Sequence, residues 1–252
     1  MDLKQSVVAI TGAGQGLGQM MAVTLAHAGA ELALLDVNQE ALNETKQQCL
    51  MLGTKTLTYQ VDVTQENQVE QIFNDIIDDF GQLNGLVNNA GILRDGLLVK
   101  VKEGKVTKLP LEQFSSVLDV NLTGTFLCGR EAAVKMIETD SKGVIINISS
   151  VARAGNIGQS NYAASKAAVA TLATTWAKEL ARYGIRAAAI APGVIKTPMA
   201  AQMKPEAIAR LESMIPAGRM GETSEIANTV KFIFENDYIN GRVIEVDGGI
   251  RM

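Results

Sequence analysis

Short apolar runs alternate with amphipathic helical stretches along the whole chain, and this alternation limits the folds that the sequence can adopt. Seven runs are typical of strands: 6–10, 31–36, 55–61, 85–88, 143–149, 185–190 and 242–246. Six helical patterns separate them: 16–28, 39–51, 65–80, 111–138, 161–183 and 223–234. Strands that alternate with helices form right-handed β-α-β units, and such units build parallel sheets. The sequence therefore predicts an α/β fold: one doubly wound parallel sheet with helices on both faces.

No linker, repeat or low-complexity tract interrupts residues 1–252, which predicts a single domain with a substantial core. The net charge of −4 provides no basic field for nucleic acid. No apolar run approaches the roughly 20 residues that a membrane helix needs. The N-terminal residues lead straight into a strand and leave no room for a signal peptide. We therefore expect a cytoplasmic protein that binds neither nucleic acid nor membranes.

Histidine and cysteine usage argues against several reaction classes. His27 is the one histidine and lies inside the first predicted helix, so a Ser-His-Asp hydrolase or a His-ligated metal site is close to excluded. We expect no metal. Cys49 and Cys128 are far apart in the sequence and form no Cys-x-x-Cys unit, which favours buried free thiols.

Residues 97–109 break the alternation of strands and helices. Apolar and basic residues alternate there around a Glu-Gly turn, which predicts a small inserted hairpin. The insertion carries one glutamate and four lysines: Lys100, Lys102, Lys105 and Lys108. One interpretation is a solvated edge that is kept basic to prevent aggregation. The other is a basic flap that meets a phosphate-bearing or acidic partner.

A second unusual segment follows Pro198. Residues 199–215 are rich in alanine and methionine, which favours a mobile helical lid over the substrate. Packing of these methionines in the core is the alternative interpretation.

The first predicted strand ends in a glycine-rich turn that runs directly into a helix. In the common Gly-x-Gly-x-x-Gly motif the third glycine would fall at position 17, but this residue is Leu17. The glycines instead fit a longer turn, Gly12 followed by Gly16 and Gly18. Such a turn brings backbone close to a pyrophosphate and aims a helix N-terminus at the anion. We therefore predict a nucleotide site at this turn, which also includes Gln15.

Asp36 closes the second predicted strand, 18 residues after Gly18. A carboxylate there accepts hydrogen bonds from both ribose hydroxyls of an adenosine, and it repels a 2′-phosphate. The next residue, Val37, supplies no cation for such a phosphate. The sequence therefore predicts NAD(H) in preference to NADP(H). After the third strand, Asp62 and Val63 are expected to flank the adenine ring, although Asp62 could equally cap a helix.

Tyr162 and Lys166 lie four residues apart and so share one face of a predicted helix. A nearby ammonium favours the phenolate, which predicts a lowered Tyr162 pKa and a proton donor or acceptor usable near neutral pH. A tyrosine and a lysine at this spacing are common and do not by themselves indicate a catalytic site. The glycine turn and the pair Ser149-Ser150, a dozen residues upstream, strengthen the catalytic interpretation.

Together these motifs resemble the short-chain dehydrogenase/reductase family over essentially the whole chain. The motifs that occur in the family's order are the glycine turn, Asn88-Asn89-Ala90-Gly91, Asn121, Ser149-Ser150, Tyr162-x3-Lys166 and Pro192-Gly193. The resemblance implies a Rossmann-type fold, nicotinamide chemistry and an assembly that is usually a homotetramer.

The resemblance also implies a proton relay. Tyr162 would be the general acid or base, and Lys166 would hold the nicotinamide ribose and lower the Tyr162 pKa. Asn121 would support a water chain that reaches Lys166. Ser150 would hydrogen-bond the substrate oxygen, although the spacing in many relatives selects Ser149. Consecutive residues after a strand point to opposite faces, so only one of the two serine hydroxyls can bind the substrate oxygen.

For the cofactor, the resemblance implies two further groups of residues. The wall behind the adenosine ribose would be formed by Asn88, Asn89, Ala90 and Gly91. The nicotinamide carboxamide would be seated by Pro192, Gly193, Val194 and Thr197.

Two branches of the family share features with this chain. Residues 150–162 and 89–98 look like 3-oxoacyl-[acyl-carrier-protein] reductases, whereas the insertion and residues 240–252 resemble type II 3-hydroxyacyl-CoA dehydrogenases. We therefore expect an NAD(H)-preferring enzyme that interconverts 3-oxoacyl and 3-hydroxyacyl thioesters carried by acyl carrier protein or coenzyme A. The alternatives are a polyol, sugar or steroid alcohol dehydrogenase, and a non-catalytic regulator that senses NAD.

Overall fold

The computed structural model describes residues 1–197 and 205–251, and its centre is a parallel sheet in the strand order β3-β2-β1-β4-β7-β8-β9. The strands are β1 (Val7–Thr11), β2 (Glu31–Asp36), β3 (Thr56–Gln60), β4 (Gly85–Asn88), β7 (Gly143–Ile148), β8 (Ile185–Pro192) and β9 (Val243–Val246). Each overlaps a strand expected from the sequence. The predicted doubly wound, Rossmann-type α/β class is confirmed.

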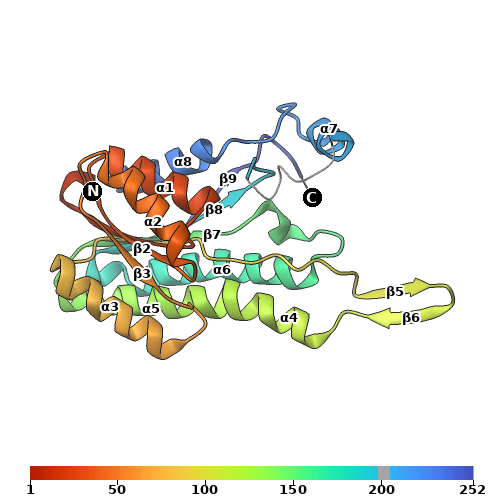
Figure 1. Ribbon diagram of the computed structural model, residues 1–252, viewed down its shortest axis with the longest axis horizontal. Coiled ribbons are helices and arrows are strands. Elements are labelled where there is room, and N and C mark those ends of the chain that lie inside the picture. Colours follow the sequence, from red (N-terminus) through yellow and green to blue (C-terminus); the bar gives the residue numbers. More distant parts are fainter. Residues whose placement is uncertain (198–204, 252) are drawn as a thin grey trace.

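Helices cover both faces of the sheet (Figure 1). One face carries α1 (Gly16–His27), α2 (Gln39–Leu50) and α8 (Thr223–Glu235), and the other carries α3 (Glu66–Phe80), α4 (Leu111–Leu118), α5 (Thr125–Glu138) and α6 (Ser160–Glu179). Two apolar clusters fill the spaces between sheet and helices, one around Phe234 and Met21 and the other around Phe73 and Trp176. None of the helices in the described part of the chain has the length and hydropathy that a bilayer span requires.

The winding direction reverses between β1 and β4. β1 pairs with β2 on one side and with β4 on the other, all in parallel. The connections that leave β1 and β4 therefore diverge to opposite faces, and a crevice opens at the carboxyl ends of these strands. This crevice is where the glycine turn and the segment after β4 meet.

The long helix expected over 111–138 is interrupted, so that expectation was wrong in one respect. A wide π-type turn, Asp119–Gly124, separates α4 from α5. Within it the Asn121 side chain bonds the backbone of Ile92, and Thr125 Oγ1 donates to the Asn121 carbonyl at 2.8 Å. Tertiary contacts thus override the continuous helical periodicity, and such turns often lie at functional sites.

The inserted hairpin is confirmed. β5 (Val99–Lys102) and β6 (Lys105–Lys108) pair antiparallel, and Glu103 and Gly104 turn the chain with φ of 53° and 76°. The hairpin projects beyond the start of α4, away from the sheet (Figure 1).

The predicted lid over 199–215 is described in part. Residues 199–204 lie outside the described residues, and Pro205–Met214 forms helix α7. After the helix, Ile215 is buried against Val151 and Met220. Since Val151 follows Ser150 directly, the C-terminal end of α7 is tied to the serine segment.

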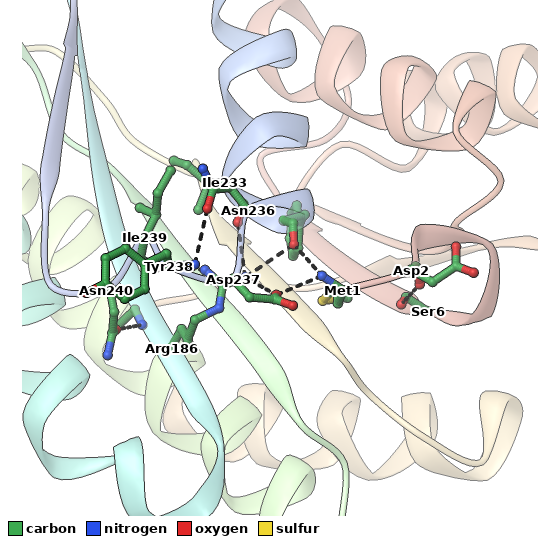
Figure 2. Close-up of polar contacts among 12 residues, drawn as sticks. Met1, Asp2, Ser6, Arg186, Ile233, Asn236, Asp237, Tyr238, Ile239 and Asn240 are labelled. Carbon is green, nitrogen blue, oxygen red and sulfur yellow. Dashed lines mark hydrogen bonds and ion pairs between the residues drawn. The ribbon is translucent and has the colours of Figure 1, made fainter.

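Arg186 on β8 closes the C-terminal end of α8 (Figure 2). Its guanidinium donates to the carbonyl oxygens of Ile239 at 2.7 Å, Ile233 at 3.1 Å and Phe234 at 3.2 Å. The α-ammonium of Met1 also donates to Phe234 O, at 2.8 Å. Carbonyls at a helix end have no partner within the helix, and here a largely buried cation satisfies them.

We predict that Arg186→Met lowers the free energy of unfolding by about 2–3 kcal/mol, because it leaves buried carbonyls without donors. Urea denaturation of the two proteins measures this difference. The matched control is Lys231→Met on α8, which removes an exposed ion pair with Glu235 and should cost less than about 1 kcal/mol. Equal losses in the two variants would contradict the prediction.

Candidate functional site

The turn after β1 is shaped to receive an anion. Gly12 and Gly16 have φ of +64° and +58°, a region that favours glycine. A Cβ at Gly18 would overlap the Gly12 carbonyl oxygen, so α1 can approach the turn only with glycine there. Gln15 precedes α1 without a side-chain cap on its first amides. The first N–H groups of α1 are thus left for a bound anion such as a pyrophosphate.

Asp36 lies at the end of β2 with its carboxylate against this turn. One oxygen accepts a hydrogen bond from Gly14 N at 3.0 Å, and the other accepts one from Asn38 N at 3.0 Å. These bonds fix the carboxylate, and each oxygen retains a further lone pair for a ligand hydroxyl. Val37 follows it with 61% of its surface exposed.

A cleft of about 580 Å³ runs along the carboxyl edge of the sheet. It brings together most of the residues that the sequence singled out: Gly12, Gln15, Gly16, Leu17, Asp36, Val37, Asp62, Val63, Asn89, Ala90, Gly91, Ser149, Ser150, Tyr162, Lys166, Pro192, Gly193 and Thr197. Four expected residues do not line it. Gly18 packs beneath the turn, Asn88 and Asn121 are buried, and Val194 lines a separate small hollow beside Val246.

Sequence reasoning missed several apolar residues that line the cleft: Val61, Ile92, Leu93, Val120, Ile148 and Ile195. Most of them lie at or just after the carboxyl ends of parallel strands. The rule that ligands bind at these strand ends in doubly wound sheets could have identified them.

Thr11 joins the two loops that form the wall of the cleft, a role that no sequence motif indicated. Its Oγ1 accepts hydrogen bonds from Asn89 N and Ala90 N, both at 3.0 Å. Asn89 Nδ2 in return donates to the carbonyls of Thr11 and Gly12. Asn88 was expected in the same wall but is buried below it. The loop after β4 is therefore fastened to the glycine turn.

Lys166 is buried on α6 beside Tyr162. Its Nζ donates to Ile148 O at 2.7 Å and lies 5.6 Å from the centre of the Tyr162 ring. A Cβ placed on Gly91 would lie 3.5 Å from Lys166 Nζ and 3.2 Å from Asn121 Oδ1. Ser150 faces the Tyr162 phenol as well. The structure therefore brings together the four residues of the predicted relay: Asn121, Ser150, Tyr162 and Lys166.

The expected lowering of the Tyr162 pKa by Lys166 is wrong for the protein alone. Burial of the phenol raises the Tyr162 pKa, a hydrogen bond with Ser150 acts in the opposite direction, and the Asp95 charge raises the pKa further. Burial also lowers the pKa of Lys166 from 10.5 to about 8. Loss of water destabilises both the Tyr162 phenolate and the Lys166 ammonium. For Tyr162 this destabilisation is larger than any stabilisation by the Lys166 ammonium, which makes no direct hydrogen bond to the phenol.

Asn121 uses its whole side chain within the protein. Its Oδ1 accepts from Ile92 N at 2.8 Å, and its Nδ2 donates to Ile92 O at 3.1 Å and to Ser165 Oγ at 3.2 Å. The amide thereby ties the π-type turn to the wall of the cleft and to α6. The side chain acts as a support for the site.

The serine pair divides into two environments. Ser149 Oγ donates to Lys166 O at 2.7 Å, which holds β7 to the backbone of α6. Ser150 Oγ accepts a hydrogen bond from Ala152 N and also bonds the Tyr162 phenol. Only the Ser150 hydroxyl contacts Tyr162 among the contacts that the structure shows for this pair. Both serines line the cleft and both contact α6, so they differ in the partner of the hydroxyl. The expectation that the two hydroxyls point to opposite faces stays a prediction.

Two further polar residues hold the start of α6, and sequence reasoning did not identify them. Asn161 is fully buried, donates to Arg94 O at 2.9 Å and accepts from Tyr162 N at 2.8 Å. Gln159 donates to the Asp95 carboxylate at 3.1 Å. These contacts position Tyr162 against the segment that leads into the hairpin, and they depend on folding that spacing alone does not reveal.

Comparison with known proteins agrees with the geometry. A family model described as "Enoyl-(Acyl carrier protein) reductase" matches residues 12–251. The chain belongs to the short-chain dehydrogenase/reductase family. It is therefore an oxidoreductase of the kind that works with a nicotinamide cofactor.

Its relatives extend over nearly the full chain. It is 39% identical to a 3-oxoacyl-[acyl-carrier-protein] reductase of Thermotoga maritima, over 99% of each chain. It is 36% identical to a (3R)-3-hydroxyacyl-CoA dehydrogenase of Mus musculus, over 100% of this chain and 98% of that protein. A crystal structure of a short-chain type dehydrogenase/reductase from Mycobacterium marinum superposes with a TM-score of 0.89 at 32% identity, covering 98% of this chain and 96% of that chain.

Burial of Lys166 predicts a pH dependence of stability. Below pH 8 the Lys166 amine is charged in both the folded and the unfolded protein. The folded protein then bears the full free-energy cost of burying the charge. Between the folded pKa of about 8 and the ordinary 10.5, the unfolded chain holds the proton and the folded chain does not. The free energy of unfolding therefore rises with pH in this window, by on the order of 3 kcal/mol.

Chemical denaturation from pH 7 to pH 10.5 tests this sign. The difference in unfolding free energy between the wild type and Lys166→Met should move in favour of the wild type as the pH rises. Lys178→Met, at an exposed position of the same helix, should run parallel to the wild type. Parallel curves for all three proteins would exclude a lowered Lys166 pKa.

Proposed function

We propose that the protein is an NAD(H)-preferring enzyme that interconverts 3-oxoacyl and 3-hydroxyacyl thioesters, and that it acts most like a 3-oxoacyl-[acyl-carrier-protein] reductase. The observation that carries the proposal is the convergence of Ser150, Tyr162 and Lys166 on one wall of the nucleotide cleft. The names of the relatives support the substrate class, because a reductase of carrier-bound acyl groups and a dehydrogenase of acyl-CoA both act at C3. A 3-hydroxyacyl-CoA dehydrogenase is the second candidate.

The residues of the cleft fit a dinucleotide. The pyrophosphate would be held by the uncapped N-terminus of α1 and the backbone of Gly12 and Gly16. Asp36 would bind the adenosine ribose, and Val37 offers no charge to a 2′-phosphate. Asp62, Val63, Asn89, Ala90 and Gly91 would surround the adenosine, and Pro192, Gly193, Val194 and Thr197 would lie along the nicotinamide. When bound, NAD(H) supplies or accepts the hydride.

The proton chemistry would come from the chain itself. A raised pKa keeps the Tyr162 phenol protonated at neutral pH, which is the form needed to protonate a carbonyl oxygen during reduction. Ser150 would donate a second hydrogen bond to that oxygen as negative charge develops on it. Lys166 would hold the nicotinamide ribose, and Asn121 would keep the wall and α6 in register.

The carrier, the assembly and the location belong to the same proposal. Acyl carrier protein or coenzyme A would present the acyl group, in the manner that the relatives' names indicate. We further propose one domain over residues 1–252, a homotetramer, and a cytoplasmic location. The exposed apolar residues Phe126, Val134 and Ile137, which lie on one stripe of α5, support self-association.

The proposed reaction predicts that the protein oxidises NADH in the presence of acetoacetyl-CoA. Tyr162→Phe removes the proton donor and should lower kcat by at least about 10²-fold, while NADH affinity, measured by fluorescence titration, stays within threefold. Tyr183→Phe, at an exposed tyrosine, is the control and should keep full activity. NADH binding without thioester reduction would refute the substrate class and leave the cofactor site intact.

Cofactor choice depends on Asp36. The wild type should have a higher kcat/KM for NADH than for NADPH, and Asp36→Ser should move the ratio toward NADPH by about tenfold or more, because the repulsion of a 2′-phosphate is removed. Steady-state kinetics with both cofactors measure the ratio. Glu40→Ser, an exposed carboxylate on α2, controls for the change in net charge, and equal ratios in all three proteins would refute the assignment.

The two serines should differ in their effect on kcat. Ser150→Ala removes the hydroxyl that faces Tyr162 and should lower kcat by about 10²-fold, and the loss of its bond from Ala152 N should cost about 1 kcal/mol of stability. Ser149→Ala removes a buried bond to Lys166 O and should cost about 1 kcal/mol of stability while kcat stays within a few fold. The reverse pattern would identify Ser149 as the catalytic serine.

A further inference from the structure

The segment that carries Ser150 is a single short turn. Val151–Ala154 forms one turn of 3-10 helix, and Ser150 precedes it as the N-cap, with its Oγ accepting a hydrogen bond from Ala152 N at 3.1 Å. Arg153 N closes the turn by donating to Ser150 O at 3.1 Å. A 3-10 turn has poorer hydrogen-bond geometry than an α-helix. The position of the Ser150 hydroxyl therefore depends on what the side chains of this turn contact.

Two side chains of the turn reach the C-terminal part of the chain. Val151 is buried in one apolar cluster with Ile250. Arg153 Nη2 donates to Glu245 Oε1 on β9 at 2.5 Å. The Arg153 side chain is 29% exposed and the Glu245 side chain is 38% exposed, so the ion pair is partly shielded from water. The last strand of the sheet is thus joined to the serine turn by a pair of opposite charges.

The same end of β9 also supports the segment that is expected to seat the nicotinamide. Gly193 N donates to Val246 O at 2.9 Å. A Cβ on Gly193 would lie 2.7 Å from Asp247 Cα, so the two backbones are in close contact there. Glu245 and Val246 are adjacent on the strand. Their contacts therefore fix the serine turn relative to the segment beside the nicotinamide.

One atom of Arg153 indicates a role beyond stability. Its Nε is buried and has no hydrogen-bond acceptor among residues 1–197 and 205–251. Burial of a donor without an acceptor is unfavourable, and a partly exposed ion pair adds little to stability. An arginine at this position is therefore a poor choice for stability alone, whereas its long side chain reaches from the serine turn to β9.

We propose that Arg153 and Glu245 are positioning residues, whose ion pair holds the serine turn where the Ser150 hydroxyl can bond the Tyr162 phenol. This inference rests on the proposed function, in which that hydroxyl and that phenol act on the same substrate oxygen. Neither Arg153 nor Glu245 lines the cleft. They act on the reaction only through the place that they give to Ser150.

The place of Ser150 affects the proton affinity of Tyr162. Burial raises the Tyr162 pKa, the hydrogen bond with Ser150 lowers it, and the Asp95 charge raises it further. Lys166 also faces the phenol, with Nζ 5.6 Å from the centre of the ring. If the serine turn moves away, the hydrogen bond weakens and the Tyr162 pKa rises. Oxidation of a 3-hydroxyacyl thioester needs the phenolate as its base, so its pH profile then moves to higher pH.

Arg153→Met tests the proposal by kinetics. The kcat for reduction of acetoacetyl-CoA by NADH should fall by about tenfold, because a displaced hydroxyl stabilises the reacting oxygen less well. The pH profile for oxidation of 3-hydroxybutyryl-CoA by NAD should move to higher pH, while NADH affinity, measured by fluorescence titration, stays unchanged. Glu245→Met should give the same result. The double variant should be no worse than either single variant, because each removes the same interaction.

The matched control is Arg251→Met. Arg251 Nη1 lies 3.1 Å from the other oxygen of Glu245 and 2.9 Å from Asp247, and it makes no contact with the serine turn among the ion pairs of the described residues. Its loss removes the same charge and should leave kcat and the pH profile unchanged. If Arg153→Met lowers the melting temperature and leaves both kinetic quantities unchanged, the ion pair is only structural and the proposal is overturned.

Hydrogen–deuterium exchange follows the serine turn without any substrate. The amides of residues 151–155 should exchange at least about tenfold faster in Arg153→Met and Glu245→Met, because local opening becomes easier, and at the wild-type rate in Arg251→Met. Equal exchange in all four proteins overturns the proposal. A wild type that reduces no thioester refutes the proposed function, and the exchange comparison still decides whether the ion pair holds the turn.

Discussion

The hydrogen bonds between the end of β1 and the loop after β4 determine where this protein can bind a ligand. In a doubly wound sheet the chain diverges between these strands, and nothing in the strand ladder holds the two connections at a fixed separation. Thr11 does so, because its hydroxyl accepts two amides of the β4 loop while Asn89 returns two bonds to the β1 turn. The glycine turn, the wall and the lysine behind Gly91 are thereby held as one rigid edge.

Burial is the second constraint, and it changes the chemistry expected of the site. Lys166 and Tyr162 are neighbours on a helix, yet both lie where water is largely excluded, so both neutral forms are favoured. A protonated phenol is suited to give up a proton to a carbonyl oxygen. The surrounding amides and hydroxyls, including Ser150, can then stabilise the charge that appears on that oxygen.

Much of this architecture could be predicted from local patterns. Apolar runs identified every strand of the parallel sheet, and the alternation of apolar and basic residues within 97–109 identified the hairpin. Both patterns depend only on residues that lie close together in the sequence. The interruption around Asn121 could not be predicted, since it depends on a bond to Ile92 from a distant loop. The prediction of a lowered Tyr162 pKa failed for a similar reason. The sequence shows which charged residues are close to Tyr162, but only the folded structure shows how far water is excluded from its phenol.

The π-type turn between α4 and α5 has a consequence for how the chain tolerates change. The turn absorbs one extra residue, because its hydrogen bonds run from i to i+5 in place of i to i+4. The helices on either side therefore keep nearly the phase that one regular helix would give them. Deleting a single residue from Asp119–Gly124 would leave α4 and the hairpin at its start in place, and it would remove the local widening that brings the Asn121 side chain to Ile92.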